Sequence, residues 1–278
     1  MKQVPFFSKL SFFLILPTLL FFLGCNADDK SKVSRSTPPP SNEVPTTASP
    51  TNAVSAADNK TASAPSISGK IILKGTPPPE RELSLNADCG KLRTTILKTR
   101  LYVVAEGGAL ADVFVYIKEG LDGKTFAPPT KTILLDQVGC EYIPYVVGLQ
   151  TKQKLLVRNS DPTMHNVHVL PKNSGNKESN KAQTSNSANL EYTFDTPEFF
   201  MTYKCEVHGW MYAYVNVVEH PFFAVSGKDG TFQIENVPEG KYLVEAYHRK
   251  AGKLTKEISV ADGKSQPLEF TFEISASQ

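Results

Sequence analysis

Short runs of β-branched and aromatic residues recur along the chain from residue 67 onward, separated by clusters of Gly, Pro, Asn and Asp. Runs of this length between turn-forming residues are typical of β-strands. No long stretch has apolar residues at helical spacing. The pattern therefore predicts an all-β chain of sandwich type. The clearest runs are 67–73, 101–104, 113–117, 154–158, 214–218, 231–234 and 242–246.

The first 24 residues have the pattern of a secretory signal peptide. Residues 10–23 are almost wholly apolar, but they are too few to span a bilayer as a permanent helix. The segment ends in Phe-Leu-Gly followed by Cys25, which resembles a bacterial lipobox, where the Cys is lipidated. We predict a lipoprotein signal peptide at 1–24 and lipidation of Cys25. The alternative is an ordinary signal peptide with an incidental Cys.

Residues 25–66 are rich in Ser, Thr, Pro, Ala and Asn, which predicts a disordered tether. We expect a lipid-anchored protein of the bacterial cell envelope, on the periplasmic side of the outer membrane or at the cell surface. Without Lys2 and Lys9, 28 basic residues balance 28 acidic ones. Because the mature chain is near neutral, no nucleic-acid partner is expected.

The cysteines divide into a pair and a single thiol. Apart from Cys25 there are three, and an odd number in an exported protein suggests one disulfide and one special thiol. We predict that Cys89 and Cys140 form the disulfide, which leaves Cys205 as the special thiol.

Cys205 begins a motif in which His208 and Met211 follow at three-residue intervals, before the Val-rich run 214–218. His165 lies upstream, in Asn-Ser-Asp-Pro-Thr-Met-His-Asn, beside another strand-like run. A thiolate, two imidazoles and a weak thioether together suit both Cu(I) and Cu(II). The four residues therefore predict one type 1 copper site. In the alternative reading, Cys205 is a small buried hydrophobe, His208 lies at the surface and Met211 fills the core.

Residues 136–218, which carry this motif, resemble the cupredoxins, the family of plastocyanin, azurin and amicyanin. The short Cys-x-x-His-x-x-Met spacing is most similar to that of amicyanin. The resemblance implies a Greek-key sandwich, copper ligation by His165, Cys205, His208 and Met211, and a hydrogen bond from Asn166 to the Cys205 loop.

The resemblance also implies how electrons would leave the site. The ring edge of His208 would reach the surface, with Trp210 and Met164 in an apolar docking patch for a redox partner. One departure from the smaller family members is the long polar segment 172–189, which we expect to be an exposed loop.

The region after residue 222 has Asp-Gly and Pro-x-Gly turn signals between short strands, and it resembles the carboxypeptidase regulatory-like, transthyretin-like sandwich. Similar strands lie far upstream, so the cupredoxin is either inserted into this sandwich or placed in tandem with it. The predicted domains are a first sandwich part at 67–125, the cupredoxin at 126–219 and the second part at 220–276.

The remaining histidines are expected to be structural or surface residues. His168 lies three residues after His165 and so points to the opposite face of a strand. His220 and His248 lie at a module junction and at a strand end.

The predicted function is the transfer of single electrons between a donor and an acceptor redox protein, without enzymatic activity and without a small-molecule substrate. The alternatives are a copper-delivery protein and a non-enzymatic interaction module at the cell surface.

Overall fold

The structure, a computed structural model, describes residues 65–261 and 265–274. The predicted signal peptide, Cys25 and almost all of the predicted tether lie outside these residues. The described part is an all-β fold, as the recurrent short runs predicted. Its first strands are β1 (Ser66–Lys74), β2 (Phe114–Glu119), β3 (Ile133–Gln137), β4 (Tyr142–Ile143), β5 (Val146–Gln150), β6 (Leu155–Asn159), β7 (His165–Leu170) and β8 (Ser179–Gln183).

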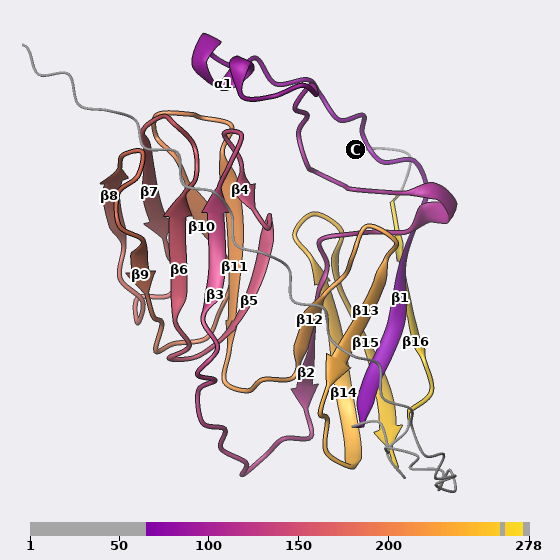
Figure 1. Cartoon of the computed structure of the whole chain (residues 1–278). Helices are drawn as coiled ribbons and strands as arrows, with labels where there is room; N and C mark the ends of the chain where they lie inside the picture. Colours follow the sequence, from indigo (N-terminus) through magenta and orange to yellow (C-terminus); the bar gives the residue numbers. More distant parts are fainter. Residues whose placement is uncertain (1–64, 262–264, 275–278) are drawn as a thin grey trace, which may run out of the picture. The chain divides into compact units, whose positions relative to one another are not determined.

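Eight further strands and two short helices complete the described elements (Figure 1). The strands are β9 (Leu190–Tyr192), β10 (Glu198–Lys204), β11 (Tyr212–Val218), β12 (Phe223–Val225), β13 (Thr231–Glu235), β14 (Gly240–His248), β15 (Gly252–Val260) and β16 (Leu268–Glu273). The helices are α1 (Ala87–Lys91) and the 3-10 turn η1 (Glu106–Gly108). None of the described helices is long and apolar enough to cross a membrane.

Strands β3 to β11 form the first sandwich. One sheet has the order β5-β11-β10-β7-β8 and the other β4-β3-β6-β9. Side chains alternate across each strand, so one face of β11 buries Ala213, Val215 and Val217 against the opposite sheet. This burial fixes the register of β10 and β11, which precede and follow the Cys205 motif.

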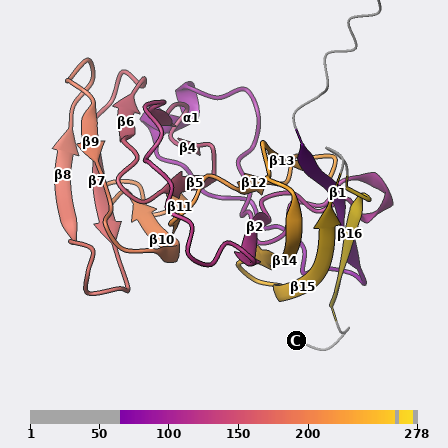
Figure 2. The ribbon, with the colours of Figure 1, turned by 90° about the horizontal axis from the view of Figure 1, so that it is seen from below.

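Strands β1, β2 and β12 to β16 form the second sandwich. Its sheets have the orders β13-β1-β16 and β12-β2-β14-β15. Strands β1 and β16, from opposite ends of the described region, pair in parallel and run side by side (Figure 2). The strands of the first sandwich, β3 to β11, thus lie in sequence between β2 and β12 of the second sandwich. This is the strand pairing expected if the first sandwich is inserted into the second. The domain limits 67–125, 126–219 and 220–276 stay a prediction.

The segment between β1 and β2 contains α1, is braced internally by Glu80 and is joined to the first sandwich by a disulfide. The Glu80 carboxylate accepts hydrogen bonds from the amides of Leu101 and Tyr102, each at 2.8 Å. Cys89 on α1 forms a disulfide with Cys140, which lies just before β4. The disulfide brings α1 to the end of the first sandwich where the Cys205 motif lies.

The prediction of an exposed loop at 172–189 was wrong in part. Strand β8 lies inside this segment and pairs antiparallel with β7 from His165↔Gln183 to Val169↔Ser179. Gln183 is buried and donates hydrogen bonds to the carbonyls of Val157 and Ala188. An edge strand can be polar because its outer face meets water, so composition alone could not distinguish it from a loop.

Candidate metal centre

The Cys205 loop is short and closed by its own backbone. Cys205 follows the end of β10, and β11 begins directly after Met211. The Cys205 amide donates to the Met211 carbonyl at 3.2 Å, and the Met211 amide donates to the His208 carbonyl at 2.9 Å. These bonds turn the chain back within the motif, so the side chains of Cys205 and His208 are held on the same side of the loop.

Three of the four predicted ligands meet at one point. His165 at the start of β7 places its Nδ1 atom 2.9 Å from Nδ1 of His208 and 3.9 Å from Sγ of Cys205. The distance from Cys205 Sγ to His208 Nδ1 is 3.7 Å. All three side chains are at most 2% exposed. They form a buried triangle of two imidazole nitrogens and one sulfur that could hold a metal ion.

The dimensions of this triangle fit a small metal ion with mixed nitrogen and sulfur ligands. Metal–nitrogen bonds of about 2.0–2.1 Å and metal–sulfur bonds of about 2.3 Å give nitrogen–sulfur separations of about 3.8 Å in a trigonal plane. The two observed nitrogen–sulfur distances agree with this value. The nitrogen–nitrogen distance is shorter than the corresponding value of about 3.6 Å, so binding would move the two rings slightly apart.

Met211, the fourth predicted ligand, is buried in the same apolar cluster as Cys205. Its backbone bonds to Cys205 and His208 place it at the end of the loop. A thioether is a weak, soft ligand for copper, which keeps Met211 as the predicted fourth ligand.

Asn166, the predicted supporting residue, joins β7 to the Cys205 loop. Its Oδ1 atom accepts from the amides of Glu206 at 2.6 Å and Val207 at 3.3 Å. Its backbone amide points at Cys205 Sγ from 3.5 Å, and the thiol lies 3.3 Å from Asn166 Oδ1. One residue therefore fixes the loop backbone and also supplies a hydrogen bond to the sulfur.

Asp161 is a site residue that the sequence interpretation missed. Its Oδ2 atom lies 2.8 Å from Nε2 of His165, and its carboxylate also accepts from the amides of Gly139 and Cys140 at 2.6 and 2.8 Å. A carboxylate bonded to the outer nitrogen of a histidine fixes the tautomer, so the inner nitrogen keeps its lone pair for a metal. The four-residue spacing between Asp161 and His165 could have suggested this role.

Electrostatics favour the ligand forms of two donors. Burial raises the pKa of the Cys205 thiol, but hydrogen bonds from His165 and nearby amides outweigh it and hold that pKa below its ordinary value. Burial lowers the pKa of His208, and the neighbouring His165 lowers it further. Burial also lowers the pKa of His165, but Asp161 and Cys205 outweigh it and raise that pKa, so a proton competes with a metal there.

The expectation that the ring edge of His208 reaches the surface was wrong, because His208 is only 2% exposed. The Cys89 and Cys140 sulfurs and a His208 ring nitrogen all lie within 4.8 Å of one another. The Trp210 ring packs at 5.2 Å from the His208 ring and donates through Nε1 to the Cys140 carbonyl at 3.1 Å. The disulfide and Trp210 thus cover His208, a contact that only the tertiary fold creates.

Two further groups of donor atoms overlap this site but include disulfide sulfurs. One combines Cys89, Cys140 and His208, and the other Cys140, Asp161 and His165. A disulfide sulfur is not a thiolate and is a poor ligand. Within the described residues, the triangle of His165, Cys205 and His208 is therefore the group with a free thiol.

The other predicted residues are placed as follows. Met164 is 46% exposed, whereas Trp210 is half-buried. His168 is bonded by Glu206 and Glu178 on its two ring nitrogens, at 2.5 and 2.8 Å, away from the triangle. His220 accepts from the Phe222 amide through Nδ1. His248 is buried in the second sandwich.

The sequence matches no protein-family model, and no curated protein matches it. Some solved structures that are similar to part of the chain are copper proteins of the cupredoxin type. One is a Cu-containing nitrite reductase (NirK) from Thermus scotoductus SA-01, with 19% identity over 35% of this chain and a TM-score of 0.30. The match spans about a quarter of the nitrite reductase, 24% of its length.

A point mutant of amicyanin in its reduced Cu(I) form is another such structure, with 18% identity and a TM-score of 0.29. It aligns over 37% of this chain and 98% of the amicyanin chain. A second amicyanin mutant, also in the Cu(I) form, gives the same values. The copper is that of the nitrite reductase and of the amicyanins.

Proposed function

We propose that this chain binds one copper ion in a type 1 site formed by His165, Cys205, His208 and Met211, and that it carries single electrons. The observation that carries the proposal is the buried contact between the two histidines. Their Nδ1 atoms face each other at 2.9 Å beside a free thiol. Without a metal, one of the two rings must carry a hydrogen on Nδ1 and donate it to the other, and a bound metal ion would take the place of that hydrogen.

Bound copper would supply one-electron chemistry between Cu(I) and Cu(II). The chain's own residues would keep the site nearly unchanged between these states. Asp161 holds the His165 ring, and Asn166 holds the loop and the sulfur. Burial of Cys205 and His208 excludes water from the donors. Rigid, dry ligands support electron transfer because few atoms must move when the charge changes.

Copper delivery is less well supported by this geometry. Passing an ion to another protein requires incoming ligands to reach the metal. The donor atoms of His165, Cys205 and His208 lie under Asn166, Trp210 and the Cys89–Cys140 disulfide, and none of the three residues is more than 2% exposed. An electron, unlike an ion, can leave a covered site.

We further propose that the donor and acceptor are redox proteins that dock beside the site. Met164, directly before His165, is 46% exposed, and Val207, directly before His208, is 49% exposed. These apolar side chains support a docking patch, together with the half-buried Trp210. The lipid anchor at Cys25 and a position in the cell envelope remain part of the proposal on sequence grounds.

A spectrum of the copper-loaded protein tests the proposed site. Metal-free protein titrated with Cu(II) should bind one equivalent and develop an intense absorption band in the orange-red region, from charge transfer between Cys205 and copper. The band should bleach reversibly on reduction by one electron. A colourless or weakly blue Cu(II) form would exclude a type 1 site.

A further inference from the structure

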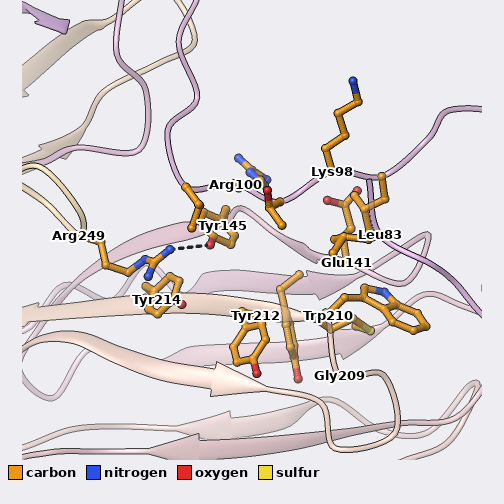
Figure 3. Close-up of a pocket in the computed structure, with 15 residues that line it drawn as sticks. Leu83, Lys98, Arg100, Glu141, Tyr145, Gly209, Trp210, Tyr212, Tyr214 and Arg249 are labelled. Carbon is orange, nitrogen blue, oxygen red and sulfur yellow. Dashed lines mark hydrogen bonds between the residues drawn. The ribbon is translucent and has the colours of Figure 1, made fainter. Parts of the chain in front are cut away.

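A cavity of about 290 Å³ lies beside the Cys205 loop. Residues from three separate parts of the described chain line it: 83–101 of the segment before β2, 141–145 and 209–214 of the first sandwich, and Arg249 after β14. Figure 3 shows Arg249 and Trp210 toward opposite ends of this cavity. Its volume is near the lower limit for small-molecule sites, which suits a ligand of one or two rings.

The walls of the cavity are strongly aromatic. Tyr145, Trp210, Tyr212 and Tyr214 all line it. Tyr145 and Tyr214 meet edge to face, with ring centroids 5.4 Å apart. A guanidinium lies over one face of each of these two rings, whereas no cation lies over the Tyr212 and Trp210 rings among the described residues, so a planar ligand can stack on those two rings. The aromatic lining therefore favours a planar, unsaturated ligand.

Arg249 places a cation at one end of the cavity. Its guanidinium lies over the Tyr214 ring at 4.4 Å, so its face is occupied while the N–H groups in its plane remain available. The Tyr145 hydroxyl is 3.5 Å from one of these nitrogens (Figure 3). Arg249 forms no ion pair with any carboxylate in the part of the chain that the structure describes. Its donors can therefore bind an external anion.

The other charges of the lining leave the cavity positive. Arg100 lies over Tyr145 at 4.4 Å and pairs with Asp112 at 3.0 Å. Glu141 is the one carboxylate among the lining residues, and Arg93 neutralises it at 2.5 Å. Lys98 is exposed and makes no ion pair with the described carboxylates. The charge pattern favours an anion at the Arg249 end.

We propose that this cavity binds a small planar aromatic anion, with its carboxylate or phenolate at Arg249 and its ring among Tyr145, Tyr212 and Trp210. The expectation was that the protein has no small-molecule substrate, and the ligand proposed here is bound but not converted. The proposal needs no metal, because none of the side chains it uses is a donor of the copper site. A bound ring would lie beside Trp210, whose own ring contacts His208.

Fluorescence of the metal-free full-length protein tests the proposal, because Trp210 is the only tryptophan in the chain. The probe is 4-nitrobenzoate, an aromatic anion that quenches tryptophan on contact. We expect saturable quenching, beyond the linear quenching of free N-acetyltryptophanamide. The neutral 4-nitrobenzamide should bind about tenfold more weakly, because it lacks the charge. Cyclohexanecarboxylate, an anion without a flat ring, should fail to displace the probe.

Three single variants, one of them a control, locate the anion. Arg249→Gln should weaken 4-nitrobenzoate binding about tenfold and leave 4-nitrobenzamide unchanged. Lys250→Gln removes the same charge from the neighbouring position, which does not line the cavity, and should change neither affinity. Lys98→Gln, at an exposed position that should not affect folding, should weaken 4-nitrobenzoate binding by about twofold. Linear quenching, or equal affinity in Arg249→Gln and Lys250→Gln, would overturn the proposal. Because copper is absent throughout, neither result depends on the proposed function.

Discussion

The two sandwiches of this chain bury polar side chains for different reasons. In the second sandwich, Glu245 is 1% exposed but is surrounded by complementary groups. It accepts from the Tyr116 hydroxyl at 2.7 Å and pairs with Lys118 and Lys253 at 2.8 and 3.3 Å. Burial raises the pKa of Glu245, but these partners outweigh burial and hold it below its ordinary value. The buried charge of Glu245 thus has internal partners.

The buried histidines show the same difference. His248 in the second sandwich accepts from the amides of Lys250 and Ala251 through Nδ1 and stacks on Tyr102 at 5.2 Å. In the first sandwich, Nδ1 of His165 lies 2.9 Å from Nδ1 of His208, beside the free thiol of Cys205. A buried histidine whose partners are all backbone groups is structural, whereas two imidazole nitrogens that converge beside a free thiol form the donor set of a metal site. Burial of histidine by itself therefore does not identify a site.

The largest effect on the difference between the two sandwiches should come from removing the Cys205 thiol of the first. Cys205→Ser should abolish the visible absorption band of the copper-loaded protein completely, because the band requires the thiolate. His168→Gln is the matched control, since His168 lies three residues from His165 and bonds to Glu178 and Glu206. It should keep the full colour. A coloured Cys205→Ser protein would show that the first sandwich has no type 1 site.

The Cys89–Cys140 disulfide should contribute strongly to the stability of the first sandwich. It closes a loop with a sequence separation of 51 residues. The loop entropy predicts that the double variant Cys89→Ser, Cys140→Ser loses about 4 kcal/mol of unfolding free energy. Chemical denaturation measures this loss.

The same variant should uncover His208, which the disulfide and Trp210 cover. Labelling of His208 by a histidine-specific acylating reagent, followed by mass spectrometry, should rise in the double variant. Asp88→Asn, an exposed change on α1 that leaves the disulfide intact, is the control. Unchanged labelling would mean that the disulfide does not protect the His208 ring.

Acid should destabilise the folded protein because His248 is buried in its neutral form. Burial lowers its pKa from 6.5 to about 4. As the pH falls below 6.5, the unfolded chain takes up this proton before the folded protein does, so stability is lost between pH 6.5 and about 4. The pKa difference corresponds to at most about 3 kcal/mol.

Urea unfolding of metal-free protein at pH 7 and pH 4 measures this effect. Between these pH values the wild type should lose about 2–3 kcal/mol more unfolding free energy than His248→Gln, because the variant lacks the titrating ring. Titrations of all other groups cancel in the difference. Equal losses would show that burial does not lower the pKa of His248.

Asp161 provides the smallest predicted effect. Asp161→Asn should weaken Cu(II) binding about 10–100-fold, because it removes the carboxylate that orients His165. Competition with a chelator of known affinity measures the change. Asp195→Asn, an exposed substitution in the same sandwich, should leave the affinity unchanged. If both variants bind copper equally, Asp161 has only a structural role at Gly139 and Cys140.

Much of the candidate site was predictable because its pattern is local. Cys205, His208 and Met211 lie within seven consecutive residues, and the strand-like runs on both sides require a tight connection between them. Short β-branched runs between turn-forming residues likewise indicated an all-β fold, because both strand propensity and turn signals are read from neighbouring residues.

The sequence by itself therefore determined the fold class and the residues able to act as ligands. Only the tertiary structure decided their surroundings: that Asp161 bonds to His165, that the Cys89–Cys140 disulfide and Trp210 cover His208, and that the 172–189 segment contains an edge strand. It also brought Arg249 to a cavity beside Trp210. The physical reason is the separation along the sequence of the residues that determine each feature. Local spacing fixes which side of a strand or loop a residue occupies, whereas burial and pairing depend on segments that are distant in sequence.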